Sequence, residues 1–212
     1  MSVVQHTHIF KVDASVYSSG TNYKTVLSEA ELLKSARFYK VADQENYLVR
    51  KYTLRHILGL FLQQEPASIT FHQQANKKPA IANLQFNTSH SKNGIVIAVS
   101  QAPIGIDIEY IDPDFDYSAI VQHHFNSAET QFINTAKDPR LAFYTLWTRK
   151  EAFLKTTGQG LVDNLSQVDS LNITGKYQHH TLHLDSLQSG NFIITAATPI
   201  ASPPIMLWSY NG

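Results

Sequence analysis

The 212-residue sequence predicts an α+β fold, because helical and strand patterns occur in separate blocks and the order of the blocks repeats once. In the first block two helical segments precede several short strands, and in the second block three helical segments precede another set of strands. The segment Gln101-Ala102-Pro103 interrupts the strand pattern between the blocks. We therefore expect an N-terminal α+β subdomain over residues 1–103 and a C-terminal α+β subdomain over residues 104–212.

The first block is expected to open with a strand and to continue with two helices. Residues 3–12 mix polar and β-branched side chains, which is typical of a strand. Ser28 followed by Glu31 resembles a capping box and predicts a helix that continues to Phe38. A longer helix is predicted over residues 43–62, where apolar residues recur at helical spacing.

The remaining elements follow from alternation, helical spacing and turn residues. Strands are predicted over residues 69–72, 84–88, 94–100 and 104–111. In the second block, helices are predicted over residues 117–125, 128–136 and 139–157, followed by strands over residues 168–173, 176–184, 191–197 and 205–210. Asp138 as the N-cap, Pro139 at the first position and Gly158 just past the end define the third of these helices.

Composition excludes several classes of protein. Hydrophobic residues make up 43% of the chain, and seventeen basic residues balance seventeen acidic ones, which argues against nucleic-acid binding through a basic surface. The absence of cysteine excludes disulfides, thiolate zinc sites and thiol nucleophiles. The first residues lack a secretory-signal pattern, and the longest apolar run, residues 95–99, is too short to span a membrane. We expect a cytoplasmic protein that binds neither nucleic acid nor membrane.

The stretch GIDIE at residues 105–109 carries the first sign of chemistry. Its two-residue period predicts a strand that places Asp107 and Glu109 on one face, roughly 7 Å apart. Two neighbouring carboxylates repel each other unless a cation lies between them or one is protonated. A hard divalent cation such as Mg²⁺ suits the pair, although a solvated strand face is the more common structure for such a pattern.

A second stretch, WTRKEAFLK at residues 147–155, lies on the last predicted helix. Glu151 and Lys155 are four residues apart, so they share a helix face and can pair. An ordinary surface ion pair is one interpretation. A carboxylate followed one turn later by an ammonium also suits a site that binds a metal ion together with a phosphate.

Three motifs together carry a family resemblance. FNTSHS at residues 86–91, GIDIE, and WTRKEAFLK about forty residues later resemble, in this order and spacing, the motifs of the 4′-phosphopantetheinyl transferases of the Sfp (surfactin-activating) type. The similarity extends from about Arg37 to Leu161. The resemblance implies two similar α/β subdomains related by a pseudo-two-fold axis, with the active site in the cleft between them.

The resemblance also implies a reaction. Family members transfer the 4′-phosphopantetheine arm of coenzyme A to a serine of an apo acyl or peptidyl carrier protein and release 3′,5′-ADP. Asp107, Glu109 and Glu151 match the Mg²⁺-binding acids, and these ligands suit Mn²⁺ as well. Glu151 also matches the general base, with a water-mediated role favoured because a metal-bound carboxylate is a poor base. Lys155 would stabilise the phosphate or protonate the leaving group, and by family analogy the enzyme acts as a monomer.

Four further residues match groups that bind coenzyme A. His90 matches a phosphate-contacting histidine, which could be protonated when a dianionic phosphate lies against it, and Ser89 would add a hydroxyl donor. Lys78 matches a lysine that precedes a proline, and Lys34 lies near the basic segment for the nucleotide phosphates.

The chain departs from the family pattern at several positions. Lys77 replaces a common glycine, and positions near Glu31 and Asn46 that are often basic in relatives are not basic here. Arg37, Arg50 or Lys77 could compensate, and the sequence does not decide among them. Glu129 matches another acid of the family, but it equally suits an N3 capping residue partnered with Asn126.

Two other functions use the same residues. A metal-dependent phosphoanhydride hydrolase would employ the acids with water as the nucleophile. A non-catalytic module would use the acidic strand pair for cation-dependent docking to a carrier protein. The joint presence of Asp107, Glu109, Glu151 and Lys155 favours catalysis, because binding alone would not require all four.

Overall fold

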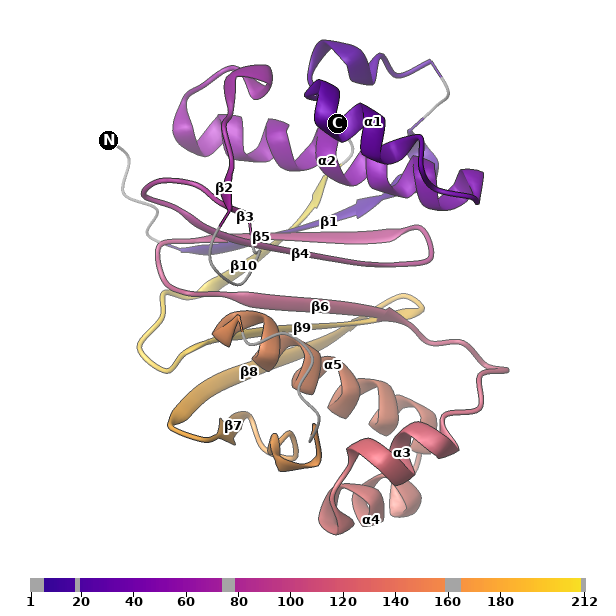
Figure 1. Ribbon diagram of the computed structural model, residues 1–212. Helices are drawn as coiled ribbons and strands as arrows, with labels where there is room; N and C mark the ends of the chain where they lie inside the picture. The colour runs from indigo at the N-terminus through magenta and orange to yellow at the C-terminus, as the bar shows by residue number, and fades with distance from the viewer. Residues whose placement is uncertain (1–5, 18–19, 74–78, 159–164, 211–212) are drawn as a thin grey trace.

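The computed structural model describes residues 6–17, 20–73, 79–158 and 165–210. Two four-stranded sheets pack against each other, and helices cover the outer side of each sheet (Figure 1). The α+β class is confirmed: each half of this arrangement combines a four-stranded sheet with one long helix. Within the described parts of the chain, no helix is long and apolar enough to cross a lipid bilayer.

The first sheet has the strand order β10-β1-β5-β4. Its strands are β1 (Thr7–Asp13), β4 (Gln85–Ser91), β5 (Gly94–Ser100) and β10 (Ile205–Tyr210). Helices α1 (Glu29–Ser35) and α2 (Val41–Leu62) cover this sheet. The connecting segments contain the 3₁₀ turns η1 (Ala14–Val16), η2 (Tyr23–Thr25) and η3 (Pro66–Ser68). They also contain two short paired strands, β2 (His72–Gln73) and β3 (Pro79–Ala80). Helix α1 begins at the capping box expected from Ser28 and Glu31.

The second sheet has the order β6-β9-β8-β7, and all its neighbours are antiparallel. Its strands are β6 (Gly105–Tyr110), β7 (Thr174–Tyr177), β8 (His180–Ser189) and β9 (Phe192–Pro199). The helices of this half are α3 (Ser118–His124), α4 (Ser127–Thr135), α5 (Pro139–Thr157) and the 3₁₀ turn η4 (Leu165–Gln167). Asp138 caps α5, Pro139 occupies its first turn, and Gly158 ends it in a left-handed conformation, as the sequence indicates.

The final strand returns to the sheet formed by the start of the chain. Strand β10 pairs in parallel with β1, so Trp208 lies opposite Phe10. The division at residues 103 and 104 stays a prediction, but residues 205–210 belong to the first sheet by hydrogen bonding and not to the second.

The two sheets share an apolar core that holds β6 beside β4 and β5. Alternate residues of β6, Ile106 and Ile108, are completely buried in this core with Ile9, Val96 and Ile194. The intervening residues of β6 must therefore point to the opposite side, toward β4 and α5. This packing fixes where the acidic side chains of β6 lie.

Three strand predictions need correction. Residues 168–173 do not form a strand, because Lys150 and Arg149 of α5 bind carbonyl oxygens of this segment, including those of Val168 and Ser170. The single strand expected over residues 176–184 is a hairpin that turns at Gln178, whose φ is +52°. The strand expected over residues 69–72 is reduced to its last residue and the one that follows it.

The shortened strand has a local cause. Arg55 Nη1 donates to the carbonyl oxygen of Ile69 at 2.9 Å and to that of Pro66 at 3.2 Å. The side chain of Arg55 therefore binds a carbonyl that a strand would offer to its neighbour. The predicted first strand begins at Thr7, because His6 is described and lies outside it; residues 3–5 of the prediction are not among the described residues.

Candidate active site

Two neighbouring strands, β4 and β6, bring two serines against two carboxylates. Ser89 Oγ donates to Asp107 Oδ1 at 2.8 Å, and Ser91 Oγ donates to Glu109 Oε2 at 2.8 Å. Asp107 is only 3% exposed, and Glu109 is partly buried. The two-residue period of both strands thus forms two matched serine–carboxylate pairs. Protein therefore covers Asp107, whereas Glu109 keeps part of its surface exposed.

Helix α5 lies close to β6 because residue 105 is glycine. A Cβ atom at Gly105 would collide with the carbonyl oxygen of Ala152 and with Thr156. From the other side, Asn87 of β4 donates through Nδ2 to the carbonyl oxygen of Lys155 at 3.4 Å. The last turn of α5 is therefore held between the two strands that carry the serines and the acids.

Lys155 joins the helix to both strands. Its Nζ lies 2.6 Å from Asp107 Oδ1 and 2.8 Å from Ser89 Oγ. The ammonium thus compensates a carboxylate that is almost completely removed from water. The other oxygen, Asp107 Oδ2, is buried and has no hydrogen-bond partner among the described residues.

The three acids of the site repel one another. Burial, then the charge of Asp107 and that of Glu151, raise the pKa of Glu109 to about 7, against the opposing effects of Ser91 and Lys155. Burial and the charge of Asp107 also raise the pKa of Glu151. Burial raises the pKa of Asp107 despite its contact with Lys155. Such a cluster favours binding of a further cation, because a cation stabilises each carboxylate in its charged form.

The predicted metal ligands are Asp107, Glu109 and Glu151. In the parts of the chain that the structure describes, no group of three or more His, Cys, Asp or Glu side chains has an arrangement that could hold a metal ion. The ammonium of Lys155 contacts Asp107 instead. The donor set still suits Mg²⁺ or Mn²⁺, which take carboxylate oxygens, and the unpartnered Oδ2 of Asp107 is available as a ligand. These residue types suit a divalent cation, but their side chains are not arranged as a metal site in this structure, and their assignment as ligands stays a prediction.

His90 follows Ser89 on β4, and its ring meets α2. Arg50 Nη1 lies 3.4 Å from His90 Nδ1, and because a guanidinium can only donate, Nδ1 is the acceptor. Removal from water, followed by the positive charges of Arg50 and Lys155, lowers the pKa of His90 to about 4. His90 is therefore neutral at pH 7, and an anion placed beside it would raise its pKa.

Basic side chains gather around the ring of Tyr47 in the first half of the chain. Lys34 Nζ lies 5.7 Å from the ring centre, and the Arg50 guanidinium and Lys51 Nζ each lie 5.9 Å from it. Arg50 extends from this cluster to His90, and its Nε is buried without a hydrogen-bond partner among the described residues. Of Arg37 and Arg50, the two suggested compensating residues that the structure describes, Arg50 is the one that adjoins the motif histidine.

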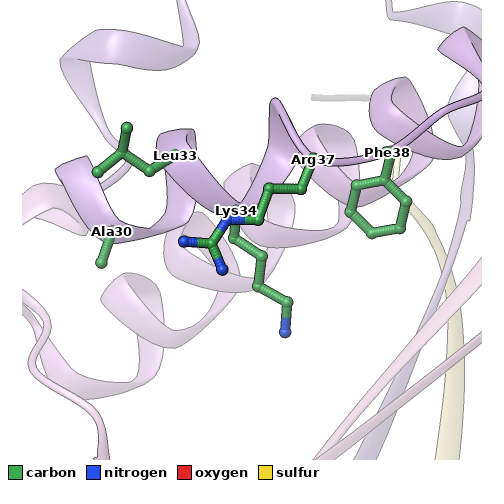
Figure 2. Close-up of a pocket in the computed structure, with 5 residues that line it drawn as sticks. All are labelled: Ala30, Leu33, Lys34, Arg37 and Phe38. Carbon is green, nitrogen blue, oxygen red and sulfur yellow. The ribbon is translucent and has the colours of Figure 1, made fainter.

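The other suggested basic residues line a pocket beside α1 or lie outside the described residues. Lys34 and Arg37 project from α1 and the following turn into a pocket of about 570 Å³, which Ala30, Leu33 and Phe38 also line (Figure 2). Lys77 and Lys78 fall outside the described residues. Glu31, near which the resemblance predicts basic residues, accepts a hydrogen bond from Arg55 Nε at 2.9 Å and caps α1.

Glu129 is bound in a different place from the three acids. It forms the predicted capping box with Asn126, and its Oε2 lies 2.8 Å from Lys150 Nζ in a completely buried ion pair. Its Oε1 accepts hydrogen bonds from the backbone N–H and hydroxyl of Ser170. Neighbouring residues of one sequence motif therefore serve different purposes: Lys150 fixes the segment after α5, whereas Glu151 and Lys155 face the acids of β6.

A second pocket, of about 320 Å³, adjoins Glu109 and is lined by both halves of the chain. Its walls are mainly aromatic and apolar; they are formed by Ser91, Lys92, Glu109, Tyr110, Asp112, Phe115, Ile120, Phe143, Tyr144 and Trp147. The segment that carries Phe115 is fixed by Arg140, whose Nη1 donates to the carbonyl oxygens of Asp112 and Phe115 at 2.6 and 2.8 Å. Glu109 thus borders a preformed, largely apolar space.

Comparison with known proteins agrees with the motifs. The family model of the 4′-phosphopantetheinyl transferase superfamily (ACPS) matches residues 103–197. The protein slr0495 of Synechocystis sp., named as a 4′-phosphopantetheinyl transferase, is 30% identical over 165 residues, which cover 74% of this chain and 67% of the relative. The chain belongs to the 4′-phosphopantetheinyl transferase superfamily. The family that the three sequence motifs predicted is therefore confirmed.

Two further relatives bear 4′-phosphopantetheinyl transferase names. Sfp of Bacillus subtilis is 32% identical over 144 residues, covering 66% of this chain and 63% of Sfp. AcpT of Escherichia coli is 30% identical over 162 residues, covering 74% of this chain and 76% of AcpT. The chain thus spans roughly two thirds of the length of several of its superfamily relatives.

Proposed function

We propose that this superfamily member transfers the 4′-phosphopantetheine arm of coenzyme A to a serine of an apo acyl or peptidyl carrier protein and releases 3′,5′-ADP. The observation that carries the proposal is the state of Asp107, which is buried, held on Oδ1 by Lys155 and Ser89, and unpartnered on Oδ2. Beside it, Glu109 and Glu151 carry raised pKa values. A cluster of three carboxylates next to a lysine supports joint binding of a divalent cation, which would favour their charged forms, and of a diphosphate.

Asp107, Glu109 and Glu151 are the proposed ligands of Mg²⁺, or of Mn²⁺ in its place. When bound there, the cation would neutralise charge on the coenzyme A diphosphate, which is the main requirement of phosphoryl transfer. Lys155 supplies a second positive charge from the side of α5. The cation and the ammonium would together offset the charge that develops on the transferred group and on the departing nucleotide.

The proposed reaction forms one P–O bond and breaks another. The carrier serine oxygen attacks the phosphorus that bears the pantetheine arm, and the bond from this phosphorus to the bridging oxygen breaks, so that 3′,5′-ADP leaves. Glu151 takes the serine proton, directly or through a water molecule, and its raised pKa favours proton uptake. Lys155 stabilises or protonates the departing phosphate oxygen.

The remaining phosphate contacts are assigned to the basic side of the site. Ser89 and His90 lie beside Lys155, and Arg50 adjoins His90. We propose that Arg50 offers the charge that is missing near Glu31 and Asn46, because its Nε is buried without a partner among the described residues. Lys34, near Tyr47, and Lys78 remain proposed contacts of the nucleotide phosphates. The monomeric state and the cytoplasmic location stay predictions.

Product analysis tests this function against the hydrolase. Apo carrier proteins are incubated with coenzyme A and Mg²⁺, and both the carrier and the coenzyme are followed by mass spectrometry. Transfer adds one phosphopantetheine to the carrier and consumes no coenzyme A when the carrier is omitted. A hydrolase consumes coenzyme A without any carrier, and a non-catalytic binding module changes neither.

A further inference from the structure

The hydroxyl of Ser91 makes two hydrogen bonds, one as acceptor and one as donor. It accepts from the backbone N–H of Tyr110 at 3.0 Å and lies 2.8 Å from Glu109 Oε2. A serine hydroxyl has one hydrogen, and the carboxylate of Glu109 in its ionised, metal-binding form can only accept, so in that form the hydrogen is directed at Glu109. Ser91 thereby fixes the side chain of Glu109 relative to the backbone of the strand that carries it.

Ser89 makes the matching contact with Asp107 but differs in its anchor. Ser89 accepts from the ammonium of Lys155, which is a flexible side chain, whereas Ser91 accepts from a backbone group of β6. Glu109 also needs such a restraint more than most carboxylates, because Asp107 and Glu151 both repel it. Without the hydroxyl, the free rotamers of Glu109 would carry it away from these charges, toward the neighbouring pocket of about 320 Å³.

We propose that Ser91 is a positioning residue that holds Glu109 in the orientation needed to bind the divalent cation. This inference rests on the proposed function, since it gives Glu109 a metal to bind. Hydrogen bonds to ligating carboxylates orient the ligand before the metal arrives, and their loss commonly costs 10–100-fold in metal affinity or activity. Ser91 carries no assigned contact with coenzyme A or with the carrier.

If the role of Ser91 were purely structural, its replacement would have a different effect. Ser91 also links β4 to β6, so its loss could weaken only the packing of the two sheets. Ser100, at the other end of the same hairpin, provides a matched control, since its hydroxyl also accepts from a backbone N–H, that of Ala102, at 3.2 Å. It pairs with the hydroxyl of Thr7 at 3.0 Å and is completely buried.

The test compares Mn²⁺ binding, followed by electron paramagnetic resonance, in the wild type and in S91T, S91V and S100A. Thr and Val have nearly the same shape and differ in the hydroxyl. We expect S91V to raise the Kd for Mn²⁺ by about tenfold or more and S91T to remain close to the wild type. S91V should also raise the KM for Mg²⁺ in the transfer assay. S100A should lower the melting temperature and leave Mn²⁺ binding unchanged; S91A replaces S91V if valine prevents folding.

Equal Mn²⁺ affinity in S91V and S91T would overturn the positioning role while leaving the proposed function intact. A loss of affinity in S100A as large as that in S91V would overturn it too, because general weakening of the sheets would then be sufficient. A wild-type protein that binds no Mn²⁺ and modifies no carrier would overturn the proposed function and this inference together.

Discussion

Lys155 Nζ lies 2.6 Å from Asp107 Oδ1, and this contact joins the last turn of α5 to the centre of β6. The lysine side chain is 30% exposed, whereas the aspartate side chain is 4% exposed. The ion pair is therefore asymmetric: the ammonium retains contact with water, and the carboxylate depends on the protein for its compensation. Both stability and ligand binding should respond when this contact is changed.

Replacing Lys155 with methionine removes the charge and keeps most of the side-chain stem. Asp107 is then left buried without its cation, and we expect a loss of about 1–3 kcal/mol in the free energy of unfolding. Urea denaturation at pH 7 without divalent cations measures the loss. The further change Asp107→Asn should restore much of the stability, because a neutral amide requires no cation. Simple additivity of the two single changes would contradict the coupling.

Gly105→Ala tests the close approach of α5 to β6. The new methyl group would overlap the carbonyl oxygen of Ala152, so the helix must shift, at an expected cost of about 1–3 kcal/mol. Because Glu151 and Lys155 would shift with it, the transfer rate should also fall. Gly190→Ala is the control: it strains a turn with φ of +61° by about 1 kcal/mol but meets no atom within 4 Å. Equal loss of activity in both variants would argue against positioning through Gly105.

Glu129→Gln separates a structural role of this acid from a catalytic one. The change leaves Lys150 charged in a site where both side chains are completely buried, and breaking such a pair commonly costs about 3–5 kcal/mol. We expect a large fall in stability by urea denaturation, together with release of the segment that Ser170 anchors. A variant that is as stable as the wild type but cannot transfer would show that Glu129 belongs to the chemistry.

Sequence periodicity and capping residues correctly predicted the parts of the fold in which the local pattern agrees with the packing. The caps of α1, α4 and α5 and the alternation of β6 are of this kind, since each depends on residues a few positions apart. Residues 168–173 had a strand-like composition, but the side chains of Arg149 and Lys150 bind the carbonyl oxygens of this segment. Such long-range contacts have no local signature.

In the candidate site, too, the roles that depend on long-range contacts could not be predicted from the sequence. The motifs predicted the acids, Lys155, Ser89 and His90 as site residues, and the structure brings these residues together on β4, β6 and α5. Ser91 and Asn87 belong to the FNTSHS motif, but their roles could not be predicted from it, because those roles depend on which elements lie beside β4. Arg50 could not be chosen over Arg37 until α2 was seen to pass beside His90.

The pH dependence of stability offers a test of the environment of His90. Its pKa is lowered to about 4 in the folded protein, below the value of about 6.5 expected in the unfolded chain. Protonation therefore favours unfolding, and this contribution to stability is complete above pH 6.5 and is lost as the pH falls toward 4. The glutamine in His90→Gln cannot titrate, so the melting temperature of this variant relative to that of the wild type should rise as the pH falls from 6.5 toward 4. Parallel melting curves would contradict the assigned environment.

The central claim is that Asp107, Glu109 and Glu151 bind a divalent cation for phosphopantetheine transfer. The most direct measurement is the intact mass of a panel of apo carrier proteins after incubation with coenzyme A and this enzyme, with Mg²⁺ or with a chelator. We expect at least one carrier to gain one phosphopantetheine with Mg²⁺ and none with the chelator, and Glu151→Gln to abolish the gain while the protein stays folded. A gain that persists with the chelator or in Glu151→Gln, or no gain in any carrier, would contradict the account.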